Sequence, residues 1–208
     1  MDFSNISTLI FDFGGVLINL NRDAAIAEFR KLGLDTADRL LDNYVQSGIF
    51  KHLEDGSLSA PDFRNEVRKL TSPKITDAQI DNAFNAFLLD IPSEKLELLL
   101  ALRSKFRVVM LSNTNPIHFP WCAETKFTYN GYHLSDFFDR CYLSYELKCS
   151  KPDALIFEKL LEQERVVPQK CLFFDDGVQN IATAQSFHFN TVLVQPNEDL
   201  RPYFSDIF

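Results

Sequence analysis

Cysteine pairs are absent from this sequence. Its four cysteines, Cys122, Cys141, Cys149 and Cys171, form no C-x-x-C motif, and no histidine lies near them at the spacing of a zinc site. This excludes a cysteine-based zinc centre of the usual spacing. The pattern is typical of reduced, mostly buried thiols in a cytosolic protein.

Long hydrophobic runs are also absent. No stretch is long enough to span a bilayer, and the N-terminal segment has no basic region and no uninterrupted apolar run, because Asp12 interrupts the best one. We therefore expect a cytoplasmic protein with no membrane partner. The sequence contains no internal repeat and no low-complexity segment.

Basic residues are outnumbered by acidic ones. The 21 lysines and arginines against 29 aspartates and glutamates give a formal net charge of −8 and a pI of about 5.0. This balance argues against a nucleic-acid partner and against an anionic membrane surface. It does not exclude an anionic substrate, because a metal ion and one nearby lysine can outweigh the net charge.

The chain has the length of one α/β domain, or of one domain with a smaller insertion. Hydrophobic residues make up 46% of it, enough for an ordinary globular core. The 20 phenylalanines are a rich supply, and we expect most of them in the core or in the wall of a pocket.

Short apolar runs alternate with helical patterns over most of the chain. The run at residues 8–17 is typical of a buried parallel strand that ends at Gly14-Gly15. Further strands are predicted at residues 106–111, 141–144, 170–174 and 191–194. Helices are predicted at residues 93–102, with Ser93 as the N-cap, and at residues 153–164 and 181–187. Residues 116–139 are irregular and aromatic, which predicts a long loop with short helical turns. This alternation predicts an α/β fold, a Rossmann-like parallel sheet with helices on both faces.

Residues 21–91 contain helical patterns and no strand. A first helix is indicated at residues 24–32, where Gly33 ends it, and a second at residues 40–45. A third follows a tight turn at Gly56 and has Ser59 as its N-cap, and a fourth runs from Thr76 to Leu88. Consecutive helices do not fit a simple crossover between parallel strands. We therefore expect residues 1–20 and 92–208 to form the sheet-containing core, and residues 21–91 to form an all-helical cap over it.

Polar residues follow four of the predicted strands. They are Asp12, Ser112-Asn113, Lys151 and Asp175-Asp176. Alone, each has an ordinary structural explanation: Asp12, for example, could cap a turn before the glycine pair. Because the carboxyl ends of parallel strands form a ligand crevice, their joint occurrence in this order indicates a functional site.

These motifs resemble those of the haloacid dehalogenase-like hydrolase superfamily along nearly the whole chain. The four motifs are Phe11-Asp12-Phe13-Gly14-Gly15-Val16, Leu111-Ser112-Asn113-Thr114, Lys151-Pro152, and Phe173-Phe174-Asp175-Asp176 with Asn180 beyond it. Residues 21–91, with the turn around Gly56, are similar to the helical cap of one subclass. Residues 111–118 most resemble its sugar-phosphate phosphatases, including the glucose-1-phosphate type.

The resemblance implies a Mg²⁺-dependent phosphomonoester hydrolase that forms an aspartyl-phosphate. The implied Mg²⁺ ligands are Asp12, the backbone carbonyl of Gly14, Asp176 and, through a bridging water, Asp175. Mg²⁺ prefers such oxygen ligands, and it neutralises the phosphate charge that would repel an attacking carboxylate.

The resemblance also implies which side chains act on the substrate. Asp12 is the nucleophile, and Ser112 and Asn113 donate hydrogen bonds to the phosphate. Lys151 stabilises both Asp12 and the phosphate, and we expect its charge to lower the pKa of Asp12. The implied partner is a small phosphorylated metabolite, bound by a monomer or weak homodimer.

Gly14 departs from the superfamily pattern. Most of the phosphatases have a second aspartate there, which protonates the leaving oxygen and later activates water. The resembled branch includes members with glycine, and general acid catalysis contributes about 10²–10⁴-fold, so activity can survive its loss. His118, His52 or water could replace the acid, although a lone histidine is usually structural.

Two other interpretations remain open on the sequence. A non-catalytic or weakly active binding module would account for Gly14, and a metal-independent haloacid dehalogenase would use the same fold. The adjacent Asp175-Asp176 pair disfavours the dehalogenase, since paired carboxylates are costly without a cation. For specificity, Phe119, Trp121 and Tyr129 could stack on a sugar ring or could simply pack the cap against the core.

Overall fold

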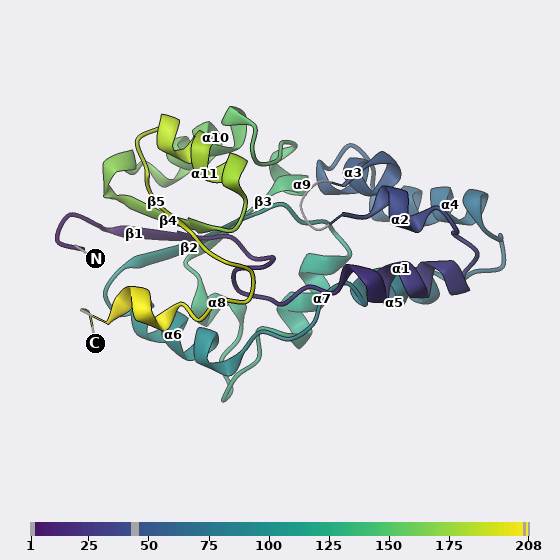
Figure 1. Ribbon diagram of the computed structural model, residues 1–208, viewed down its shortest axis with the longest axis horizontal. Helices are drawn as coiled ribbons and strands as arrows, with labels where there is room; N and C mark the ends of the chain where they lie inside the picture. The colour runs from purple at the N-terminus through teal and green to yellow at the C-terminus, as the bar shows by residue number, and fades with distance from the viewer. Residues whose placement is uncertain (1–2, 43–45, 206, 208) are drawn as a thin grey trace.

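The computed structural model describes residues 3–42, 46–205 and 207. Five parallel strands form one sheet in the order β3-β2-β1-β4-β5 (Figure 1). They are β1 (Thr8–Phe11), β2 (Arg107–Ser112), β3 (Arg140–Leu143), β4 (Cys171–Asp175) and β5 (Asn190–Leu193). The predicted α/β fold with a parallel sheet is confirmed.

Helices cover both faces of this sheet. On one face lie α10 (Ala154–Glu164) and α11 (Val178–Ser186), and on the other lie α6 (Ser93–Arg103) and α8 (Leu134–Phe137) (Figure 1). Side chains of β1 alternate accordingly: Leu9 and Phe11 belong to one buried cluster, and Ile10 belongs to the other. Short elements complete this part: α7 (His118–Thr125), α9 (Ser144–Leu147), η1 (Pro168–Lys170) and η2 (Arg201–Phe204).

In the described part of the chain, five helices form an insertion between β1 and α6, beyond the carboxyl ends of the strands (Figure 1). They are α1 (Arg22–Lys31), α2 (Ala37–Leu40), α3 (Gly48–Glu54), α4 (Ala60–Leu70) and α5 (Asp77–Asn85). Their core is aromatic: the Phe50 ring lies 5.1 Å from those of Phe63 and Phe84, with edge-to-face geometry. This helical insertion therefore has apolar packing of its own.

Local sequence signals set most helix ends in the insertion. The Ser59 side chain accepts a hydrogen bond from the backbone of Asp62, and Thr76 forms a capping box with Gln79. Gly33 follows α1 with a φ of +92°. The N-cap predicted at Ser59 and the helix end predicted at Gly33 are confirmed, and the capping box places the start of α5 next to Thr76, where a helix start is predicted.

Other predicted ends differ from the structure. Ser93 is the first residue of α6 rather than its N-cap, since Pro92 occupies the cap position and its fixed φ suits the approach to a helix. Leu41 is extended and ends α2, while Tyr44 and Val45, the rest of that predicted helix, lie outside the described residues. The region 116–139 contains a true helix, α7, of eight residues.

The chain enters and leaves the insertion through adjacent segments. The backbone of Leu89 donates to Asn19 O at 2.9 Å, and that of Asn21 donates to Phe87 O at 2.7 Å. Leu20 and Leu88 form an antiparallel bridge between the two segments. Leu88 therefore lies beyond α5, which ends at Asn85, and not inside it as its spacing predicts.

All four cysteines are free thiols. Cys122, Cys149 and Cys171 are buried and Cys141 is half-buried, as expected from the sequence. Burial raises the pKa of Cys122, Cys141 and Cys171 to about 12, which keeps these thiols protonated and unreactive. Within the described ranges, no helix has both the length and the apolar character that crossing a bilayer requires.

Candidate active site

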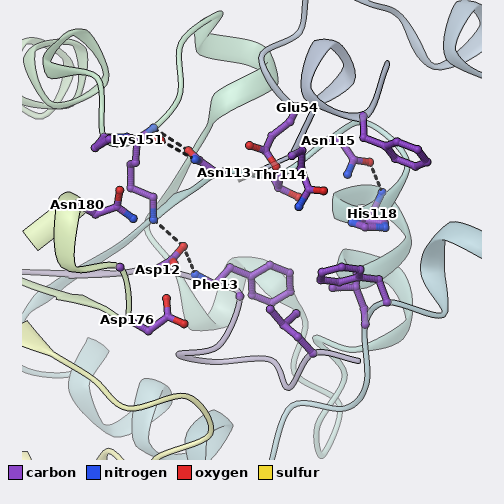
Figure 2. Close-up of a pocket in the computed structure, with 18 of the residues that line it drawn as sticks. Asp12, Phe13, Glu54, Asn113, Thr114, Asn115, His118, Lys151, Asp176 and Asn180 are labelled. Carbon is purple, nitrogen blue, oxygen red and sulfur yellow. Dashed lines mark hydrogen bonds and ion pairs between the residues drawn. The ribbon is translucent and has the colours of Figure 1, made fainter. Parts of the chain in front are cut away.

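Asp12 lies directly after β1, at the centre of the sheet edge. It is 8% exposed, and its backbone N–H is held by Phe174 O at 2.9 Å. Its Oδ1 accepts hydrogen bonds from the backbone of Phe13 and from Lys151 Nζ, both at 2.7 Å (Figure 2). Within the described ranges Oδ2 accepts none, so one carboxylate oxygen is fixed and the other remains available.

Lys151 places its ammonium between two carboxylates. Nζ lies 2.7 Å from Asp12 Oδ1 and 2.7 Å from Asp175 Oδ2, and it donates to Leu111 O at 2.9 Å. Burial lowers the pKa of Lys151, but Asp12 and Asp175 more than compensate, and the net shift is upward. The lysine is therefore a fixed positive charge beneath the site.

Asp175, the last residue of β4, and Asp176, which follows it, lie in different environments. Asp175 is fully buried, and its second oxygen, Oδ1, accepts from the Gly177 backbone at 2.7 Å and from Asn180 Nδ2 at 2.9 Å. Asp176 is half-buried and lines the cavity. Because both oxygens of Asp175 are engaged by the protein, Asp176 is the freer ligand of the two. The parts assigned to them from the sequence stay predictions.

The three carboxylates are close enough to share a cation. Asp12, Asp175 and Asp176 each offer an oxygen within 4.8 Å of the others. Burial raises the pKa of Asp12 to about 7, which outweighs the opposing effect of Lys151. Burial also raises that of Asp176 to about 6, and Asp175 adds to the rise. One lysine thus does not neutralise three carboxylates, and a hard divalent ion fits the oxygen donors present.

The expected lowering of the Asp12 pKa is therefore wrong in sign. Lys151 acts in the expected direction, but the desolvation of Asp12 and the nearby carboxylates outweigh one ammonium. Burial could not be judged from the sequence. The charge of a bound cation would act in the same direction as Lys151 and favour ionised Asp12.

Gly15 brings the backbone against Asp176. Its φ is +74°, and a Cβ there would lie 2.3 Å from Asp176 Oδ2. Any side chain at this position would displace the carboxylate, and the left-handed conformation adds strain of its own. The second glycine of the pair therefore keeps Asp176 at the cavity.

Asn113 is engaged with the backbone of Lys151. Its Nδ2 donates to Lys151 O and its Oδ1 accepts from Lys151 N, both at 2.8 Å. Ser112 is 1% exposed, and its hydroxyl lies 3.3 Å from Asn113 O. Asn113 lines the cavity and Ser112 is not among its lining residues. Their phosphate contacts stay predictions, and the structure adds a positioning contact for Asn113.

A cavity of about 490 Å³ lies above these groups, between the sheet edge and the helical insertion. Phe13, Phe50, Phe84 and Phe87 contribute apolar wall, and polar side chains are interspersed among them (Figure 2). Besides Asp12, Lys151 and Asp176, the polar lining comprises Gln46, Glu54, Asn113, Thr114, Asn115, His118, Gln179 and Asn180. The cavity has the size and mixed lining of a site for a small polar molecule.

The aromatic residues at positions 119–132 do not line this cavity. Phe119 is buried in the main cluster, and Trp121 and Tyr129 pack against it. The Tyr129 hydroxyl also bonds to Glu97. Of the two open alternatives for these rings, packing is the one observed.

The comparison with known proteins agrees with this geometry. Residues 6–188 match the model of the haloacid dehalogenase-like hydrolase family. The chain belongs to this family. The four motifs of the superfamily thus lie at one sheet edge, with Asp12, Lys151 and Asp175 joined by the ion pairs described above.

Several relatives are similar over nearly the full length. A D-ribitol-5-phosphate phosphatase of Bacteroides thetaiotaomicron is 39% identical over 196 residues, which cover 94% of this chain and 95% of the relative. A crystal structure of a haloacid dehalogenase family enzyme from that organism, in complex with magnesium and inorganic phosphate, is 39% identical. It has a TM-score of 0.91 and covers 96% of this chain and 99% of the other. The structure of a predicted haloacid dehalogenase-like family hydrolase from Porphyromonas gingivalis is 33% identical, also with a TM-score of 0.91, over 98% of both chains.

This haloacid dehalogenase-like hydrolase has a glycine at position 14 and therefore no acidic side chain there. The two histidines proposed to replace it do not fit that role well. His118 Nε2 lies 3.1 Å from Phe84 O, to which it donates, and burial lowers the pKa of His118 to about 4. It is therefore neutral at pH 7, with one ring N–H already used. His52 is exposed and is not among the residues lining the cavity.

Sequence reasoning missed Glu54 as a site residue. The sequence pattern predicts only a tight turn after this residue, yet its side chain lines the cavity from the helical insertion (Figure 2). Burial raises the pKa of Glu54 to about 8, although Lys151 opposes the shift. A signal existed in the sequence: an acid next to the tight turn of the cap, in a chain whose usual acid is replaced by Gly14.

Proposed function

We propose that this chain hydrolyses small polyol or sugar monophosphates in a Mg²⁺-dependent reaction that passes through an aspartyl-phosphate at Asp12. The observation that carries the proposal is the arrangement of Asp12, Asp175 and Asp176 within 4.8 Å of one another, with Lys151 paired to the first two. The resemblance to a phosphatase over 94% of the chain supports it.

Asp12 acts as the nucleophile through Oδ2. Oδ1 is held by Lys151 Nζ and by the backbone of Phe13, which fixes the plane of the carboxylate. Oδ2 attacks phosphorus, the bond from phosphorus to the ester oxygen breaks on the opposite side, and the alcohol leaves. Water then attacks the phosphorus of the aspartyl-phosphate and releases inorganic phosphate.

Mg²⁺ would be held by Asp12, Asp176 and the Gly14 carbonyl, with Asp175 through a bridging water, and it supplies neutralisation of phosphate charge. Lys151 remains in contact with Asp12 Oδ1 throughout, so its charge also opposes the repulsion between carboxylate and phosphate. Ser112 and Asn113 donate hydrogen bonds to phosphate oxygens. Asn113 has a second Nδ2 hydrogen for this contact besides the one it gives to Lys151.

The substrate we propose is a monophosphate of a pentitol or of a sugar of similar size. A cavity of about 490 Å³ suits a molecule of this size, and amide side chains in its wall (Gln46, Asn113, Asn115 and Gln179) suit hydroxyl groups. D-Ribitol 5-phosphate is the first compound to test, because the relative with 39% identity is named for it. Glucose 1-phosphate is the second.

We also propose that residues 21–91 act as a cap on a catalytic core made of residues 1–20 and 92–208. The paired segments around Leu20 and Leu88 support this division, because the chain enters and leaves the insertion side by side through them. We place the protein in the cytoplasm, as a monomer or weak homodimer. Four free thiols are consistent with a reducing compartment.

The test is a panel of phosphorylated metabolites, assayed for released phosphate with Mg²⁺ and with a chelator. We expect turnover of at least one sugar or polyol phosphate, its loss on chelation, and its loss in Asp12→Asn. Turnover that survives chelation would contradict the metal site. Failure to hydrolyse any member of the panel would instead favour a binding module.

A further inference from the structure

Among the described residues, the Glu54 carboxyl group has no hydrogen-bond or ion-pair partner, and it lines the cavity of the proposed phosphate site. It ends α3, and its side chain points into the cavity from the side opposite Asp12 and Asp176 (Figure 2). In the described part of the chain its carboxylate forms no ion pair, and no donor bonds to it. An ionised carboxylate would repel a phosphoester dianion, so a basic side chain would be expected in this position. The presence of an acid here therefore suggests a chemical role.

The backbone of Glu54 is fastened to the sheet edge. The Ser144 hydroxyl, directly after β3, lies 2.7 Å from Glu54 O and 3.0 Å from Thr114 O, the two carbonyls to which it can donate. It also accepts from the backbone N–H of Thr114 at 3.0 Å. Ser144 is fully buried. One hydroxyl thus connects the end of β2, the end of β3 and the end of α3. The position of Glu54 relative to the strand ends is set by this contact.

The turn after Glu54 is held in the same way. Lys148 Nζ donates to Gly56 O at 2.6 Å. Gly56 has a φ of +71°, and a Cβ there would lie 2.1 Å from Tyr145 O. Only glycine allows this close approach between the insertion and the segment that follows β3. Two independent contacts therefore hold Glu54 above the site.

We propose that Glu54 is the general acid that Gly14 cannot supply: it protonates the ester oxygen as the alcohol leaves. This inference rests on the proposed phosphatase function and names a further catalytic residue for it. In-line displacement puts the leaving oxygen on the side of phosphorus opposite Asp12. That side faces the helical insertion, where Glu54 is located.

The proton balance of the reaction closes with one group. In the first step the bond from Asp12 Oδ2 to phosphorus forms, the bond from phosphorus to the ester oxygen breaks, and the proton of Glu54 passes to that oxygen. In the second step water attacks phosphorus, the Asp12–phosphorus bond breaks, and a water proton returns to Glu54. The raised pKa of Glu54, about 8, supports a protonated group at neutral pH.

The test compares leaving groups in single-turnover reactions with Mg²⁺ and enzyme in excess. Glu54→Gln keeps the shape of a protonated carboxyl and removes its acidity. We expect it to slow release of the alcohol from an alkyl phosphate such as D-ribitol 5-phosphate by about 10²–10³-fold. Release of p-nitrophenol from p-nitrophenyl phosphate, which needs no protonation, should slow by less than about tenfold.

Two further variants complete the design. Glu54→Asp retains an acid and should recover part of the rate that Glu54→Gln loses on the alkyl phosphate. If Glu54→Gln does not fold, the comparison of Glu54→Asp with the wild type provides the test. His52→Gln, an exposed change on the same helix, should leave both rates unchanged. Because ionisation of Glu54 in the unfolded chain favours unfolding at pH 7, the thermal unfolding midpoint of Glu54→Gln should be no lower than that of the wild type.

The outcomes separate this proposal from the one it rests on. If the wild type releases both leaving groups and Asp12→Asn releases neither, but Glu54→Gln slows both equally or not at all, Glu54 is not the acid and the phosphatase function stands. If the wild type releases neither leaving group, the phosphatase function fails and the role of Glu54 fails with it.

Discussion

The side-chain amide of Asn113 forms two hydrogen bonds with the backbone of Lys151, one through each of its polar atoms and both at 2.8 Å. Asn113 follows β2, and Lys151 follows β3 and α9. The pair therefore fastens the segment that carries Lys151 to the neighbouring strand end. Mutations at Asn113 should act through Lys151 as well as through the phosphate.

Asn113→Asp replaces the donor to Lys151 O with a carboxylate oxygen that repels it. We expect kcat/KM to fall by about 10–100-fold, the range seen when a group that orients an active residue is lost. The measurement is steady-state phosphate release. Asn65→Asp, an exposed change on α4, adds the same charge far from Lys151 and should leave kcat/KM unaltered.

Gly15→Ala should weaken Mg²⁺ binding more than it weakens the fold. The new Cβ would meet Asp176 Oδ2 at 2.3 Å, and the positive φ adds about 1–2 kcal/mol of strain. Gly131→Ala is a matched control: its φ is +85°, but nothing lies within 4 Å of the added Cβ. Both variants should lose stability in chemical denaturation. An equal Mg²⁺ dependence of activity in the two would argue against the close approach to Asp176.

Asp176→Asn should have opposite effects on stability with and without Mg²⁺. Burial and Asp175 raise the pKa of Asp176 to about 6, so its charge destabilises the metal-free fold at pH 7, and the variant should unfold at a higher temperature than the wild type. A ligand at 100 times its Kd adds about 2.7 kcal/mol, and the variant should lose most of this gain. Asp90→Asn, at an exposed side chain, should keep the full gain from Mg²⁺.

His118 should make the fold sensitive to mild acid. Burial lowers its pKa to about 4, against about 6.5 in the unfolded chain, so protonation favours unfolding. The stability contributed by neutral His118 is complete above pH 6.5 and is lost as the pH falls. At pH 4 this loss amounts to about 3 kcal/mol of unfolding free energy. Urea titrations across this range should show a shallower pH dependence in His118→Phe. The exposed change His188→Asn should retain the wild-type dependence; a slope unchanged in His118→Phe would contradict the assignment.

The sheet could be predicted because its signals are local. The buried strands are short apolar runs, and the residues that follow them, Asp12, Lys151 and Asp175, meet because parallel strands end at one edge. The capped turn at Ser59 is equally local. The start of α6 was placed one residue late, because the serine signal at Ser93 masked the effect of Pro92.

The rest of the site depends on contacts between distant residues. The place of Glu54 depends on Ser144, 90 residues further along the chain, and no periodicity predicts such a hydrogen bond. The pKa of Asp12 could not be judged because it depends on burial, which outweighs the visible charge of Lys151. The two hydrogen bonds between the Asn113 side-chain amide and the Lys151 backbone could not be predicted from the sequence either.

The most direct test of the account is to look for phosphate on Asp12. The wild type and Asp12→Asn are mixed with Mg²⁺ and an accepted substrate, quenched in acid during turnover, digested and analysed by mass spectrometry. We predict one phosphoryl group on Asp12 of the wild type and none in the variant, whose turnover falls by at least about 10⁴-fold. Undiminished turnover in Asp12→Asn, with no phosphate on this peptide in either protein, would contradict the account.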